Sequence, residues 1–261
     1  DAIMAAATNK TSPGSLAERA AAIKFLKHLY LTRVSGGQQL WCYAGPKAYS
    51  EWVFDEVKGN DSTIKSRLAA ENEVYGISDR KAMCDALSLA LAWCQKGAAA
   101  LGTAGAKQKQ LIRDWFADAN TTDAQLEEAR TTLAAGLLKI AGVCNSGRLI
   151  FSDHAPDRAK GGWRDWAFVY KSEKMDVVYM QGAALKAAHS ASKQWMCALT
   201  IIHELTHREM ATDDHRYDFD GLAPGPNLPF DKAIDNADSW AYFTLDLVGI
   251  LSPSDRSKVL A

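Results

Sequence analysis

The chain has 261 residues, of which 48% are apolar and 23% are charged, and its formal net charge is −1. These values are typical of an ordinary soluble globular protein with one large domain or two small ones. A net charge so close to zero excludes a general electrostatic attraction to nucleic acid or membranes, and no apolar run is long enough to span a bilayer.

Helical patterns fill the first part of the chain. A first helix is predicted over Ser15–Val34, where a serine can cap the helix start, and shorter ones over 46–57 and 62–72. Residues 1–77 are therefore predicted to form an N-terminal helical extension. The chain begins with Asp1 and shows no signal peptide, so we expect a processed product or an excised part of a longer protein.

The next part of the chain changes from helical to extended patterns. Three further helices are predicted over Ser78–Cys94, Lys107–Phe116 and Thr122–Ala141. Short runs rich in β-branched and aromatic residues predict a small antiparallel sheet, with strands over Arg148–Ser152, Trp166–Tyr170 and Asp176–Met180. The last of these runs is our candidate for a strand that binds substrate backbone, with plain packing as the alternative. Residues 78–261 are predicted as one α+β domain, or as part of one continuous domain over the whole chain.

The strongest chemical signal is an HExxH motif that begins at His203. Residues four apart share one face of a helix, so His203 and His207 can bind one zinc ion. Glu204 stands beside the first ligand, where its carboxylate can accept a proton from a zinc-bound water. The preceding segment, 195–202, is apolar enough to lie buried behind the metal.

A catalytic zinc needs a third protein ligand, and the following residues narrow the choice. No glutamate occurs after Glu209, which excludes a ligand Glu on a later helix. Asp213 has the spacing of the pattern HExxHxxGxxH, but Met210 stands where that pattern needs a glycine at positive φ. Asp214 follows directly, and the sequence leaves both aspartates open as ligands.

The residues after the motif resemble those of the aspzincins, the deuterolysin-like and peptidyl-Lys metalloendopeptidases. These enzymes carry HExxH followed by GTxDxxYG, and Thr212, Asp214 and Tyr217 match that pattern in register. The resemblance implies a mainly helical, zincin-like fold with a small sheet beside the motif helix. It further implies Zn2+ as the cofactor, with His203, His207 and Asp214 as ligands, Glu204 as general base and Tyr217 as hydrogen-bond donor to the oxyanion.

The chain departs from the family pattern at several positions. Ala211 and Asp218 replace the two glycines, and the turn after the motif helix is shorter than in most members. A downstream helix is predicted over 231–248 and carries Asp238, where the lysine-specific members place the first of two acids that bind the substrate lysine. Ala241 occupies the second of these positions, so strict lysine preference is not expected. Asp238 is a candidate substrate-binding residue, or alternatively it orients a zinc-bound histidine.

The function predicted from these residues is zinc-dependent hydrolysis of peptide bonds in a protein or peptide substrate. One setting is a secreted digestive peptidase, and another is an exported toxin domain delivered to a rival cell's periplasm, with an immunity protein as partner. Rival hypotheses are a zinc amidase acting on peptidoglycan stem peptides and a non-catalytic zincin-fold binding domain. Five cysteines without a CxxC pair make a structural zinc site an unfavourable interpretation, and the odd count leaves at least one thiol free.

Overall fold

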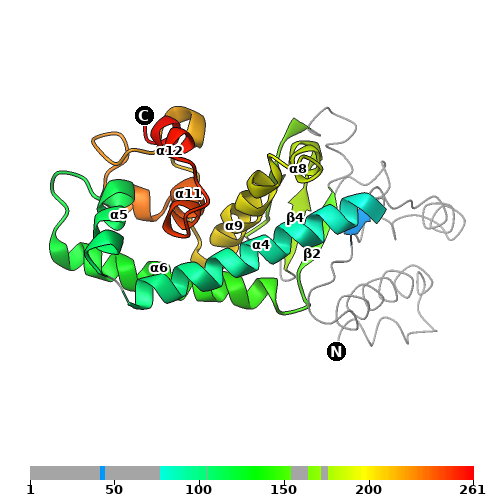
Figure 1. Ribbon diagram of the computed structural model, residues 1–261, viewed down its shortest axis with the longest axis horizontal. Helices are drawn as coiled ribbons and strands as arrows, with labels where there is room; N and C mark the ends of the chain where they lie inside the picture. The colour runs from blue at the N-terminus through cyan, green and yellow to red at the C-terminus, as the bar shows by residue number, and fades with distance from the viewer. Residues whose placement is uncertain (1–41, 45–76, 104, 154–163, 172–175) are drawn as a thin grey trace, which may run out of the picture.

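The computed structural model describes residues 42–44, 77–103, 105–153, 164–171 and 176–261 (Figure 1). Its longer helices are α4 (Ile77–Gly102), α5 (Ala106–Phe116), α6 (Asp123–Cys144), α9 (Gln194–Met210) and α11 (Ala237–Leu247). The shorter ones are α8 (Gly182–Ala188), η3 (Asp218–Asp220), α10 (Phe230–Ile234) and α12 (Pro253–Val259). The strands are β1 (Cys42–Ala44), β2 (Ile150–Asp153), β3 (Ala167–Phe168) and β4 (Val177–Met180). The architecture is mainly helical α+β, as predicted.

The predicted N-terminal extension falls almost entirely outside the described residues, as do its three helices. The exception is β1, which pairs in parallel with β2 and so joins the sheet of the following domain. The boundary at residue 77 therefore stays a prediction.

Two long helices, α4 and α6, lie side by side and form the base on which the motif helix rests (Figure 1). The start of α6 is fixed by a capping box, in which Gln125 N donates to Thr122 Oγ1 at 3.3 Å and Thr122 N donates to Gln125 Oε1 at 2.9 Å. Helix α4 extends past its predicted end at Cys94 to Gly102. A Cβ on Gly97 would lie 2.9 Å from Leu137 Cδ1, so glycine permits close packing there.

Helix α9, which carries the HExxH motif, is enclosed by other elements. It lies between α8 and α11, and α4 and α6 also contact it (Figure 1). Ile201, Ile202 and Leu205 are completely buried, and each contributes about 1.5–3 kcal/mol through burial. His203 and His207 are themselves no more than 9% exposed. The motif therefore belongs to the core rather than to a surface helix.

The sheet is mixed, and the prediction of an antiparallel sheet was wrong in this respect. The strand order is β1-β2-β4-β3; β1, β2 and β4 are parallel, and only β3 runs antiparallel to its neighbour. Strand β4 corresponds to the predicted run 176–180 and pairs on both sides, so it has no free edge for a substrate. That proposal was wrong as well. Among the described strands, β1 and β3 stand at the two ends of the sheet, and β3 contacts α9.

The predicted final helix over 231–248 is two helices, α10 and α11, that meet at Asn236. The break has a tertiary cause, because Asn236 Oδ1 accepts hydrogen bonds from the backbone N–H groups of His215 and Arg216, both at 2.9 Å. After α11, Ser252 starts α12: its Oγ accepts from Asp255 N at 3.0 Å, and Pro253 occupies the first turn.

The four cysteines whose side chains the structure describes are free thiols: Cys84, Cys94, Cys144 and Cys197. Burial raises the pKa of Cys144 and of Cys197 to about 12, so both stay protonated at neutral pH. Among the described residues, no helix has both the length and the apolar character needed to cross a membrane.

Gly136→Ala is expected to destabilise the protein by about 1–3 kcal/mol. A Cβ at Gly136 would lie 2.5 Å from Trp240 Cζ3. The indole cannot easily move, because it is 1% exposed and its Nε1 donates to Ile234 O at 2.7 Å. This clash outweighs the gain in helix propensity, which is at most about 1 kcal/mol.

Urea denaturation checks this prediction, with Gly142→Ala as the matched control on the same helix. Gly142 is exposed and has open space around its Cα, so alanine there should increase the free energy of unfolding. Equal effects of the two substitutions would contradict the proposed clash.

Candidate metal centre

Three side chains converge at the end of α9: His203, His207 and Asp214. The two Nε2 atoms are 3.2 Å apart, and Asp214 Oδ1 lies 3.2 Å from His203 Nε2 and 3.3 Å from His207 Nε2. A tetrahedral zinc with ligand bonds of about 2.0–2.1 Å holds its ligand atoms about 3.3 Å from one another. The three atoms thus already stand at the mutual distances that zinc requires, and the residues fit this metal.

Both imidazoles are held with Nε2 directed at this point. His207 Nδ1 donates to Thr212 O at 2.7 Å, and because a carbonyl only accepts, Nδ1 carries a proton and Nε2 is the nitrogen directed at the metal position. His203 Nδ1 lies 2.7 Å from Asp238 Oδ1, which fixes the same tautomer. Partners of this kind orient metal-binding histidines and raise their basicity.

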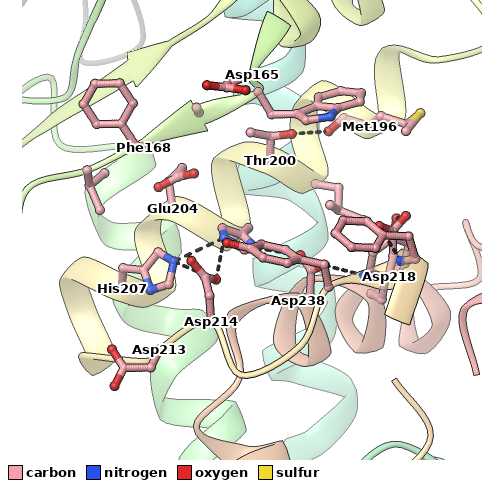
Figure 2. Close-up of a pocket in the computed structure, with 18 of the residues that line it drawn as sticks. Asp165, Phe168, Met196, Thr200, Glu204, His207, Asp213, Asp214, Asp218 and Asp238 are labelled. Atoms are coloured by element: carbon pink, nitrogen blue, oxygen red, sulfur yellow. Dashed lines mark hydrogen bonds and ion pairs between the residues drawn. The ribbon is translucent and has the colours of Figure 1, made fainter. Parts of the chain in front are cut away.

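The structure separates the two aspartates that the sequence left open. Asp214 points between the histidines, whereas Asp213 points away from them (Figure 2). Asp213 forms an ion pair with Lys171 instead, and its N–H donates to Asp235 O at 2.8 Å. Of the two, only Asp214 has the geometry of the third ligand.

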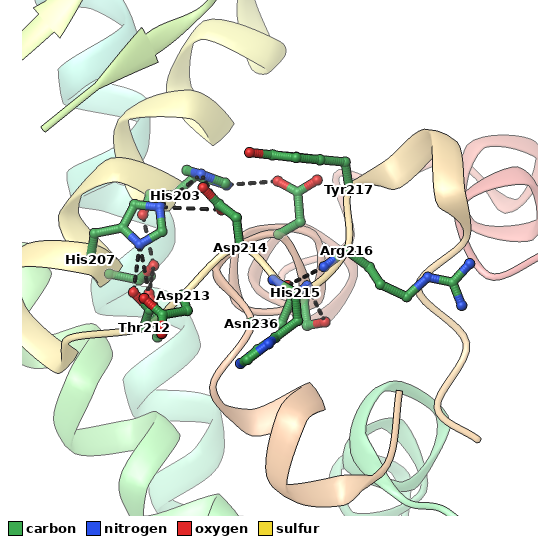
Figure 3. A network of polar contacts seen from close by, with 12 residues as sticks. His203, His207, Thr212, Asp213, Asp214, His215, Arg216, Tyr217 and Asn236 are labelled. Atoms are coloured by element: carbon green, nitrogen blue, oxygen red, sulfur yellow. Dashed lines mark hydrogen bonds and ion pairs between the residues drawn. The ribbon is translucent and has the colours of Figure 1, made fainter. Parts of the chain in front are cut away.

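The segment that carries Asp214 is fixed at both ends. At its start, Ala211 terminates α9 in the left-handed region with φ 60° and ψ 26°, which turns the chain back over the motif. At its end, Asn236 binds the backbone of His215 and Arg216 (Figure 3), and Ala237 N donates to Asp213 O at 3.1 Å. The ligand thus reaches the histidines from a loop attached to the start of α11.

Ala211→Gly is expected to stabilise the protein by about 0.5–1 kcal/mol. Relief of the left-handed conformation is worth about 1–2 kcal/mol, and the freer unfolded chain takes back about 0.4–1 kcal/mol. Thermal and urea unfolding measure the difference. Ala223→Gly is the control, because this exposed loop alanine has no positive φ and should lose stability on substitution. If Ala211→Gly lowered the free energy of unfolding, this would contradict the proposed strain in the left-handed conformation of Ala211.

Glu204 and Tyr217 both line the cleft beside the ligand group. Glu204 is 4% exposed, lines the cleft and lies on the side of Phe168 in β3 (Figure 2). Burial raises the pKa of its carboxyl above the usual value. Tyr217 is 40% exposed and its hydroxyl bonds Asp214; burial and that carboxylate raise its pKa to about 12, so it remains a donor at neutral pH.

The electrostatics of the group favour a cation. Burial alone would lower the pKa of His203, but hydrogen bonds with Asp214 and Asp238 outweigh it and raise the pKa to about 10. Burial alone would raise the pKa of Asp214, but hydrogen bonds with His203 and His207 hold it well below its usual value. A bound divalent ion would replace the protons on the histidines, so metal binding should release protons.

Asp238 is not a free acidic group, which favours the alternative that it orients His203 over a role in substrate binding. It is 7% exposed, one oxygen lies 2.7 Å from His203 Nδ1, and the other accepts from Asp218 N at 2.9 Å. It therefore has the alternative role of orienting His203. Asp218 Oδ2 in turn accepts from the Tyr242 hydroxyl at 2.8 Å, so the acids on this side of the cleft all have partners.

Two supporting residues were missed at the level of sequence. Asn236 was given no role from the sequence, although its side chain is fully buried and orders the ligand loop. Thr212 was matched to a motif without a role. It is 1% exposed, and its Oγ1 lies 2.7 Å from Thr206 Oγ1. A buried polar residue beside a metal motif is a signal that could have identified both.

The ligand group opens into a cleft of about 740 Å³. One wall is the segment around β3, including Trp166, Phe168 and Lys171, and the opposite wall includes Tyr217 and Phe219. The edge strand and the ligands therefore face the same space, which can accept an extended chain. The ion pair between Lys171 and Asp213 joins the β3 segment to the ligand loop.

Comparisons with known proteins were made on this basis. The sequence model of the aspzincins, described as lysine-specific metallo-endopeptidase, matches residues 100–245, which is more than half of the chain. Six chains of solved structures match. One is a zinc peptidase from Grifola frondosa, with 22% identity and a TM-score of 0.47 over 65% of this chain and 96% of that one. The search of curated proteins found no match.

Proposed function

The chain belongs to the aspzincin family of zinc metallopeptidases, and from this premise we infer that it is an endopeptidase that cleaves internal peptide bonds of extended polypeptides. The observation that carries the proposal is the set of three ligand atoms, 3.2–3.3 Å apart, beside a buried carboxylate at the edge of an open cleft. A binding scaffold would need the metal ligands but not Glu204.

Each side chain has a proposed role in this reaction. His203, His207 and Asp214 would hold zinc, which, when bound, polarises the scissile carbonyl and lowers the pKa of a water molecule. Glu204 takes the proton of the attacking water and transfers it to the leaving amine. The Tyr217 hydroxyl donates to the oxygen on which negative charge develops. Ala167 and Phe168 of β3 line the cleft, so this strand can align the bond of a substrate chain that lies along it.

The proposed preference is broader than cleavage beside lysine. Both oxygens of Asp238 are engaged, and position 241, the second acidic position in lysine-specific members, is a buried alanine. The next acid on that wall, Asp218, accepts from Tyr242. No carboxylate among these residues is left to bind a substrate ammonium group.

The direct test is cleavage of denatured casein by protein stripped of metal and then reloaded with Zn2+. Zinc-loaded protein should release internal fragments, the metal-free protein should not, and mass spectrometry should find cleavage at bonds without lysine. Release of single terminal residues alone would contradict endopeptidase action. Digestion of purified peptidoglycan sacculi without casein cleavage would instead support an amidase.

The biological setting is a further proposal: an exported enzyme that acts in a rival cell's periplasm and is neutralised by an immunity protein. It is supported by residues 1–76, which lie outside the family match and, except for β1, outside the described domain, and which leave room for a delivery-related part. Expression directed to the periplasm of a bacterial host should stop growth, while cytoplasmic expression and periplasmic Glu204→Gln should not. Equal growth in all three cases would contradict this setting.

A further inference from the structure

We propose that Phe219 and a second hollow beside the catalytic cleft form an extended subsite for the substrate chain on one side of the scissile bond. This proposal rests on the proposed endopeptidase function. The hollow has a volume of about 770 Å³ and adjoins the cleft, because Met196, Asp218, Phe219 and Tyr242 line both spaces. Figure 2 shows Met196 and Asp218 at the same end of the cleft, beyond Asp238.

Phe219 stands where the two spaces meet. Its side chain is 81% exposed, which makes it the most exposed of the large apolar residues that the structure describes. Its ring stacks on Tyr217, with centroids 5.4 Å apart and planes 19° from parallel. Tyr217 in turn binds the ligand Asp214. An aromatic surface therefore continues from the metal ligands to the second hollow. Exposed aromatic side chains of this kind are common anchors for a bound chain.

The walls of the second hollow suit a polypeptide better than a single small ligand. Trp195 and Val259 offer apolar surface, and charges of both signs stand around them, including Lys193 and Asp220. Walls that carry charges of both signs do not select a ligand with a single positive or negative group. They match the varied side chains of an extended peptide, which reaches beyond the catalytic cleft once its backbone lies along β3.

The occupant is therefore the part of the substrate that continues past Tyr217 and Phe219. About five residues of extended chain, or about 17 Å, are available to it in a long peptide and absent from a short one. The enzyme should then cleave long, unfolded chains much better than short peptides with the same scissile bond. Phe219 would be a specificity-determining residue that contacts substrate without contacting the reacting atoms.

The experiment compares peptides built around a bond that the protein cleaves in casein. One has about five residues on each side, and the others are cut to two residues on one side or the other. Truncation on one side should lower kcat/KM about tenfold or more, and Phe219→Ala should remove most of that advantage of the long peptide. Ser192→Trp, which fills the second hollow away from Tyr217, should have the same effect. Leu138→Ala is the control, because this α6 side chain is 60% exposed and does not line either space.

Binding gives a readout that needs no turnover. Fluorescein-labelled casein should bind zinc-loaded Glu204→Gln about tenfold more tightly than the double variant Glu204→Gln/Phe219→Ala. Equal cleavage of long and short peptides, or equal binding by these two proteins, would overturn the subsite. A fall in kcat of the same size for long and short peptides would mean that Phe219 acts only through Tyr217, and this also overturns it. Absence of cleavage by the wild type, with the binding difference intact, would count against the proposed function alone.

Discussion

Asp214→Asn is expected to weaken zinc binding by at least about a hundredfold and to remove peptidase activity with it. The substitution keeps the size of the side chain but removes the negative charge that lies 3.2 and 3.3 Å from the two Nε2 atoms. Two neutral imidazoles then remain as protein ligands, which is fewer than a catalytic zinc site uses. Competition with a chromophoric chelator measures the affinity.

The neighbouring Asp213→Asn is a matched control for this prediction. Asp213 is exposed, pairs with Lys171 and points away from the histidines. Its substitution should change zinc affinity and casein cleavage by no more than about twofold, the size expected for an exposed ion pair. If Asp213→Asn lost the metal while Asp214→Asn kept it, the ligand would be the other aspartate, and the family register would be wrong by one residue.

Glu204→Gln is expected to lower kcat by about 10²–10⁴ while zinc stays bound. Glutamine keeps the shape of the buried side chain but cannot accept the proton of the attacking water. Glu209→Gln is the control, because this residue follows on the same helix and does not line the cleft. Unchanged turnover of zinc-loaded Glu204→Gln would remove the general base from the mechanism.

Glu204→Gln is also expected to change the stability of the metal-free protein. The pKa of Glu204 is raised in the folded protein, chiefly by burial, so the folded state disfavours the ionised carboxylate. At neutral pH, above the ordinary pKa of glutamate, this ionisation lowers the free energy of unfolding. Metal-free Glu204→Gln should therefore unfold at a higher temperature than metal-free wild type. A lower temperature would show that the carboxylate stabilises the fold.

The sequence was most informative where the chemistry needs a short, local pattern. His203, Glu204 and His207 are set by helical spacing, so their shared face follows from the period of the helix. Asp214 could be favoured over Asp213 only through the family pattern. The directions in which these two aspartate side chains point depend on Ala211 and Asn236, which are more than twenty residues apart along the chain.

Long-range pairing explains most of what the sequence did not reveal. The strands are two to four residues long, and nothing in such short runs specifies whether a neighbour is parallel or antiparallel. The break between α10 and α11 lies within a segment predicted as one helix and is imposed by contacts of Asn236 with the ligand loop. The sequence left open whether Asp238 binds substrate or orients a histidine, because its partners, His203 and the backbone of Asp218, could not be foreseen.

The attachment of the ligand loop to the start of α11 also bears on how this active site tolerates insertions. Because the backbone of Asp213 is paired with that of Asp235 and Ala237, the aspartate ligand is held from the C-terminal side as well as by the turn that leaves α9. This second attachment would keep Asp214 near the histidines even if the turn between His207 and Thr212 changed in length.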